Sequence, residues 1–237
     1  MSYHYTLPAG FFAATSTVAD GNMDFRFGAA DDVERARAQF CSEHAPQVKK
    51  LAVCHVEIAD GIITVDAATD ISQPLHCDAL VTRERGAGLF LLTADCIPLI
   101  CIDTEHDIVA LVHLGWKPTA LSLAKKVVEH MQSLGASTQS MHVYAGPGIH
   151  AASYLCTDPE QRNDPAWADC ITHVSGNQYA VDLYKKNEEE LRACGIRPEQ
   201  IHMNAPDTFV DTQFFSHYRA HRTGEPEGRI ATLVCCL

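Results

Sequence analysis

Short apolar stretches recur along the chain and predict strands. Nine of them carry alternating or continuous apolar positions, are rich in β-branched residues and are bounded by turn formers: residues 49–58, 60–67, 77–82, 86–95, 96–105, 107–116, 140–149, 177–184 and 228–236. Such patterns are typical of half-buried or fully buried strands. We therefore expect a large sheet system.

Three other segments, residues 31–44, 119–135 and 181–195, place apolar residues on one face at helical spacing. Gly135 and Gly195 stand at the ends of the last two, where glycine commonly terminates a helix. The polar stretch 159–169 predicts a loop or a short irregular helix. The expected fold class is α/β (mixed α+β), with a central, mostly β core and flanking helices.

No linker, low-complexity tract or repeat of fixed period interrupts this pattern, so we expect one domain spanning residues 1–237. The net charge of −12 argues against nucleic acid as a partner, because phosphate backbones are bound by basic residues. The chain begins without a signal-like segment and holds no apolar run of about 18 residues, which predicts a cytoplasmic protein without a membrane anchor. The ten cysteines lie in apolar runs, which favours buried, reduced thiols over disulfides.

Candidate chemistry concentrates at Cys96 and His113. Each stands at the end of an apolar stretch, and their separation of 17 positions is enough for a strand, a turn and a returning strand. Thiolate and imidazole together suit zinc or copper. From the spacing alone, a buried cysteine and a core histidine with satisfied hydrogen bonds remain the alternative.

Several motifs in a fixed order resemble those of the YfiH-type laccase-domain family. They are TADCIPLICID, VHLGW, GPGI at residues 146–149, VDLYKKNEEELRACGI, and FFSHYR followed by GR. The likeness runs from about Leu51 to Val234, with a weaker echo in FFAATSTVADG near the N-terminus. The chain resembles a divergent member of this family.

The resemblance implies a mixed α/β domain and a metal site, usually assigned as zinc, made by one cysteine and two histidines. Members are reported to cleave purine nucleosides with phosphate, to deaminate adenosine and, in older descriptions, to oxidise polyphenols with copper. Carried onto this sequence, Cys96 matches the family cysteine and His113 the second histidine. Both are expected to be catalytic and to bind the metal.

The first histidine of the family motif is replaced. Relatives have Gln-Val-His-Gly where this chain has His55-Val56-Glu57-Ile58, so Glu57 takes the histidine position. Residues two apart on a strand share a face, and a carboxylate can complete a zinc site. As third ligand we favour Glu57, then His76, then His55; a site without a third ligand also stays open.

Other departures concern the basic positions. Lys117 replaces the arginine of the family's Gly-Trp-Arg-Gly motif, Val18 replaces that of Ser-Thr-Arg, and Leu155 stands where a glutamate is common. Arginine binds phosphate through a planar fork that lysine lacks, so we expect a weakened phosphate site. This favours deamination by a zinc-activated water over phosphorolysis.

Further substrate contacts are expected from Phe214 or Phe215, which could stack on a purine, and from Arg219 or Lys117, which could bind ribose or phosphate. A core phenylalanine pair with solvated polar neighbours is the alternative. Asp95 is the third catalytic candidate beside Cys96 and His113: it could hydrogen-bond a ligand histidine, or it could instead cap a turn.

Two functional classes therefore stay open. The leading hypothesis is a zinc-dependent enzyme, with copper as the alternative metal, that acts on purine nucleosides and phosphate. The rival is a catalytically impaired nucleoside-binding or metal-binding regulatory protein. A multicopper oxidase is disfavoured because the chain has no His-X-His pair. The oligomeric state stays open, a homodimer included.

Overall fold

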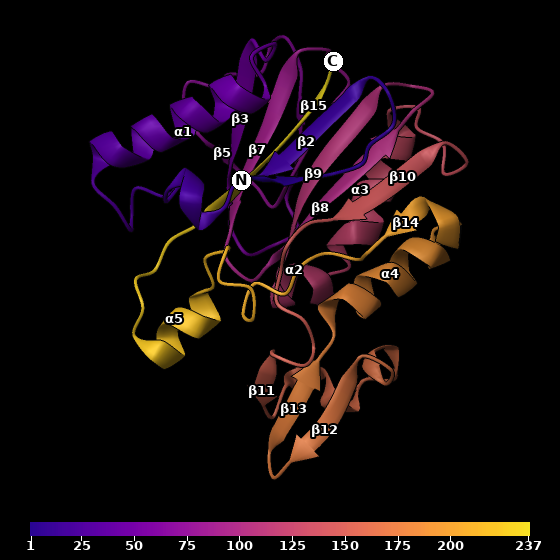
Figure 1. Cartoon of the computed structure of the whole chain (residues 1–237). Helices are drawn as coiled ribbons and strands as arrows, with labels where there is room; N and C mark the ends of the chain where they lie inside the picture. Colours follow the sequence, from indigo (N-terminus) through magenta and orange to yellow (C-terminus); the bar gives the residue numbers. More distant parts are fainter.

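The computed structural model describes residues 1–237 and contains two six-stranded sheets and a smaller three-stranded one (Figure 1). The first sheet has the order β1 (Tyr3–His4), β2 (Phe11–Thr15), β15 (Ile230–Cys236), β7 (Ala87–Thr93), β3 (Lys50–His55) and β5 (Leu75–His76). The second has the order β14 (Ile201–His202), β10 (Met141–Ala145), β8 (Ile97–Asp103), β9 (Ile108–Leu114), β6 (Ala79–Thr82) and β4 (Ile62–Val65). The third consists of β11 (Leu155–Thr157), β13 (Gln178–Val181) and β12 (Ile171–Ser175).

Five α-helices accompany the sheets: α1 (Ala30–His44), α2 (Trp116–Ala120), α3 (Leu123–Ser133), α4 (Leu183–Ala193) and α5 (His217–Thr223). Figure 1 shows α1 on the side of the first sheet and α3 and α4 on the side of the second. The three-stranded sheet and α5 lie together at one end of the molecule, beyond the ends of the long strands (Figure 1). No helix combines the length and apolarity that crossing a lipid bilayer requires.

The two large sheets pack face to face over a shared apolar core. Leu89 and Val234 of the first sheet and Ile100 and Leu111 of the second belong to the same buried cluster. Their other faces are covered by helices: Phe40 of α1 packs with residues of the first sheet, and a larger cluster joins α3 and α4 to the second. The layers are thus helix, sheet, sheet and helix.

The sequence predictions of fold class and elements are confirmed. Each of the nine predicted strand segments contains a strand. The first and third helical segments correspond to α1 and α4, and the second contains α3 but only the last two residues of α2, which begins earlier, at Trp116. The second segment is broken where Ser122 adopts a left-handed backbone with φ of 55°. The pattern does not predict helix α5, nor the strands β1, β2, β5, β11, β12 and β14. All ten cysteines are free thiols, and six of them are buried.

Candidate functional site

Cys96 and His113 lie together at one end of the second sheet. Antiparallel pairing of β8 with β9 sets Ile97 opposite Leu114 and Pro98 opposite His113. Cys96, the residue before β8, is therefore beside the end of β9, and Cys96 and His113 line the same cavity. A Cβ added at Gly115 would lie 2.8 Å from the Cys96 Sγ, so the small residue makes room for the thiol. The predicted proximity of Cys96 and His113 is confirmed.

Asp78 orients His113. Its Oδ1 lies 2.8 Å from the His113 Nδ1, and the aspartate side chain is fully buried. The same carboxylate accepts hydrogen bonds from the backbone N–H groups of Glu57, Ile58 and Ala59. Sequence analysis missed this role, although an aspartate at the start of an apolar strand, as in the segment CDALVT, was a usable signal. A carboxylate on Nδ1 fixes the ring and leaves Nε2 for chemistry.

Asp95 does not contact His113. Its Oδ1 accepts a hydrogen bond from the Thr208 hydroxyl at 2.7 Å, and its Oδ2 accepts one from the Tyr218 N–H at 2.6 Å. Tyr218 lies in the first turn of α5, whose backbone N–H groups lack partners within the helix. Of the two roles expected for Asp95, the structure shows the capping role, and the capped element is the distant helix α5.

The charge state of His113 depends on its two neighbours. Burial alone disfavours the imidazolium, but the Coulomb interaction with Cys96 and the hydrogen bond to Asp78 outweigh it and raise the pKa of His113 to about 9. The ring is therefore charged at neutral pH. Burial also opposes ionisation of Asp78, but the His113 hydrogen bond and the backbone donors lower the pKa of the carboxyl below its usual range.

This arrangement predicts a defined pH dependence in metal-free protein. Because the folded-state pKa of His113 lies above its unfolded value of about 6.5, its stabilising contribution is complete below about pH 6.5 and is lost as pH rises through about 9. NMR titration of the imidazole should give a midpoint near 9 in wild type. In Cys96→Ala the midpoint should be lower. A wild-type midpoint at the ordinary histidine value, or no change in the variant, would contradict this account.

The pair opens into a cavity of about 630 Å³, a size ordinary for a small-molecule site. A second cavity of about 130 Å³ shares Cys96, Gly115 and Trp116 with the first. The larger cavity contains a concentration of positive charge that contrasts with the net charge of −12: Arg26, Arg37, Lys117 and Arg229 line it, with Asp24 as the one acidic residue.

The cavity cations differ in how far they are neutralised. Arg26 is bound by Asp24, with 2.6 Å between Nη2 and Oδ2. Arg37 donates from Nε to the Met23 carbonyl and lies over the Phe25 ring, and it forms no ion pair; Lys117 forms none either. Arg229 has one distant carboxylate partner, Glu227, at 3.7 Å. Two unpaired cations and one weakly paired cation therefore face the cavity.

Sequence reasoning missed the three arginines because they come from distant segments, two near the N-terminus and one directly before β15. Lys117, which it did name, lines the cavity. The other predicted substrate residues do not: Phe214 is buried, the Phe215 ring packs against Gly228, and the Arg219 guanidinium donates to Glu225 and to backbone carbonyls. The aromatic residues in the cavity lining are Phe25 and Trp116.

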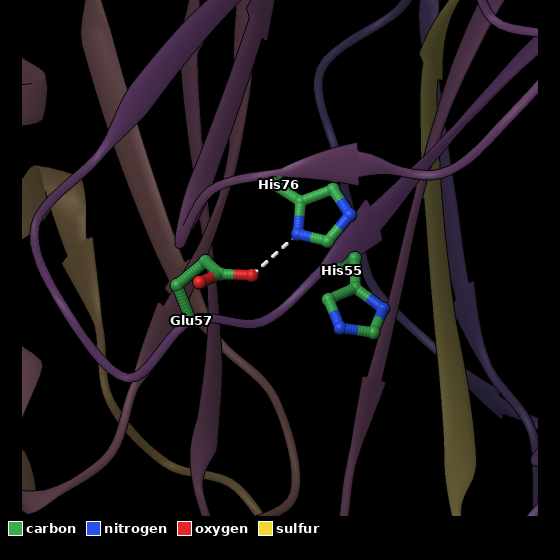
Figure 2. A group of neighbouring side chains, drawn as sticks. All are labelled: His55, Glu57 and His76. Carbon is green, nitrogen blue, oxygen red and sulfur yellow. Dashed lines mark hydrogen bonds and ion pairs between the residues drawn. The ribbon is translucent and has the colours of Figure 1, made fainter.

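The candidate third ligands lie together but apart from Cys96 and His113. His55 lines the cavity, whereas Glu57 and His76 do not. Figure 2 shows the three side chains close together, with the Glu57 carboxylate joined to His76; the His76 Nδ1 and the Glu57 Oε1 are 2.5 Å apart. Two groups of three potential metal ligands occur in the chain, each with its ligand atoms within 4.8 Å of one another. Neither group includes Cys96 or His113. This pair therefore falls one protein ligand short of the three usual in a catalytic zinc site.

Comparison with known proteins identifies relatives of this chain. The family model described as multi-copper polyphenol oxidoreductase laccase matches residues 13–237. A purine nucleoside phosphorylase of Staphylococcus aureus is 27% identical over 162 residues, which cover 67% of this chain and 59% of that protein. A purine nucleoside phosphorylase of Bacteroides thetaiotaomicron is 30% identical over 161 residues, covering 65% and 58%. The crystal structure of YlmD from Geobacillus stearothermophilus has a TM-score of 0.85 at 25% identity, over 96% of this chain and 92% of that one.

Proposed function

Because the chain belongs to the multi-copper polyphenol oxidoreductase laccase family, we propose that it cleaves purine nucleosides with phosphate in the cavity beside Cys96 and His113. The observation that carries this proposal is the set of weakly neutralised cations, Arg37, Lys117 and Arg229, which face the same cavity as the oriented imidazole of His113. The names of relatives add support, since two of them are purine nucleoside phosphorylases. The alignments reach less than two thirds of those proteins' lengths.

The cations of the cavity could form a phosphate-binding site that the sequence alone did not predict. Val18 and Lys117 suggested a weakened phosphate site, but Arg37 and Arg229 bring two guanidinium groups to the cavity. Arginine and lysine bind phosphate oxygens through charge-assisted hydrogen bonds, which are about twice as strong as neutral ones. Anion binding in a protein of net charge −12 requires such a local excess of cations.

The reaction we propose uses residues of this chain alone. A phosphate oxygen forms a bond to the ribose C1′ while the C1′–N9 bond breaks and its electron pair moves onto the purine. The His113 imidazolium, held through Nδ1 by Asp78, donates a proton from Nε2 to the departing purine and later regains one from solvent. Phe25 and Trp116 are placed to stack on the base, because both line the cavity.

A zinc ion at Cys96 and His113 would have two protein ligands in this arrangement, so no step above passes through a metal. Deamination of adenosine by zinc deaminases depends on a three-ligand zinc with an activated water. The cavity does not offer that donor set. We therefore propose phosphorolysis as the activity and not deamination. The altered arginine positions in the sequence had favoured deamination.

The test is product analysis with inosine and adenosine in the presence and absence of phosphate. We expect free purine base and ribose 1-phosphate only when phosphate is present, and the rate should survive prior treatment with a chelator. Release of inosine and ammonia from adenosine without phosphate would instead establish deamination. Nucleoside binding without any product would support the catalytically impaired regulatory protein.

A further inference from the structure

The cluster of His55, Glu57 and His76 lies outside the reaction proposed above, and its composition is that of a metal site. We propose that these three side chains bind one divalent cation of the zinc class at the rim of the cavity, separately from the Cys96 and His113 pair. Two imidazoles and one carboxylate are a common ligand set for zinc and for other borderline transition metals.

Strand pairing brings the two histidines together. β3 and β5 are parallel neighbours, and their register sets Cys54 opposite Leu75 and His55 opposite His76. Residues directly opposite on neighbouring strands project to the same face. The two imidazole rings consequently lie with their centroids 4.4 Å apart, and Figure 2 shows them as neighbours.

The turn after β3 returns the carboxylate to them. Asp78 accepts hydrogen bonds from the N–H groups of Glu57, Ile58 and Ala59, which folds the chain tightly after His55. Glu57 then reaches across to His76 and forms its one ion pair there. The buried carboxylate that orients His113 thus also shapes this cluster.

The ligand atoms are close enough to bind one ion after small rotations. All three lie within 4.8 Å of one another. A tetrahedral zinc with bonds of about 2.0–2.2 Å separates its ligands by roughly 3.3 Å. The 2.5 Å contact between His76 and Glu57 must therefore open slightly. The side chain of His76 is 69% exposed and that of Glu57 is 45% exposed, so both are free to rotate apart. The exposure also leaves room for a water molecule as the fourth ligand.

The chain contains a matched control. His217, His221 and Glu227 form a second group of the same composition, but Glu227 already faces both histidines and Arg229. A guanidinium beside the carboxylate disfavours a cation there. We therefore expect zinc to choose the first cluster and not the second.

The experiment is zinc titration against a chromogenic chelator, with elemental analysis, on Cys96→Ala protein so that the cavity pair does not contribute. We expect one zinc per chain, lost when His76→Ala or Glu57→Gln is added and retained when His221→Ala is added. Zinc should also raise the thermal midpoint of Cys96→Ala, and not of Cys96→Ala with His76→Ala, because a ligand stabilises the fold that binds it.

Retention of zinc in the His76→Ala background, its loss with His221→Ala, or no zinc at all would overturn the proposal. Both histidines are exposed, so neither substitution endangers folding. The outcome is independent of phosphorolysis, because binding is measured without nucleoside.

Discussion

Asp78→Ala is expected to lower the free energy of unfolding by about 3–5 kcal/mol, the usual cost of removing one partner from a buried ion pair. The substitution would leave the imidazolium of His113 buried without its carboxylate and would leave the N–H groups of Ile58 and Ala59 unpaired. Denaturant unfolding monitored by circular dichroism measures the effect. Asp78→Asn keeps the shape and loses the charge, so its loss of stability should be smaller.

Asp60→Ala is the matched control for that comparison. Asp60 also pairs with a cation, Lys126, but both side chains are more than 40% exposed, and exposed pairs contribute little. We expect its unfolding midpoint to stay close to that of wild type. Equal losses in Asp60→Ala and Asp78→Ala would show that Asp78 has no special structural role.

His113→Gln is expected to reduce the kcat of phosphorolysis by about 10²–10⁴-fold, the range typical of a lost general acid. Glutamine can still donate a hydrogen bond to Asp78, so the site should keep its shape while losing a titratable proton. The KM for nucleoside should change much less than kcat, because Phe25, Trp116 and the arginines remain in the cavity. Steady-state kinetics on inosine with saturating phosphate make the measurement.

The pH profile separates a proton donor from a merely structural histidine. Wild-type kcat should fall as pH rises through about 9, where His113 loses its proton, and the residual rate of His113→Gln should show no such fall. His173→Gln, in the exposed strand β12, is a control that should change neither the kcat nor the pH at which kcat falls. A His113→Gln enzyme with wild-type kcat would remove this residue from the mechanism.

Local sequence was enough for most of the secondary structure. Strands β7, β8 and β9 are short apolar runs whose ends are marked by turn residues, and the two glycines after α3 and α4 adopt the left-handed backbone expected of helix ends, with φ of 104° and 88°. These features depend on neighbours within a few residues. The break at Ser122 was not visible, because the helical pattern of apolar positions continues through it.

The sequence also determined that Cys96 and His113 would meet, since one hairpin between adjacent strands joins them. Tertiary structure decided what surrounds the pair. Asp78, Arg37 and Arg229 reach the site from segments far apart in sequence, and no local pattern encodes which sheet edges and helix ends will converge.

The same limit applies to the third ligand. The sequence offered His55, Glu57 and His76 as alternatives, but only the parallel register of β3 with β5 and the turn held by Asp78 decided that the three lie together as one group that does not include Cys96. The strand that pairs with β3 in this mixed sheet depends on how whole sheet faces are buried. That choice is a property of the complete fold and leaves no trace in the residues of the site.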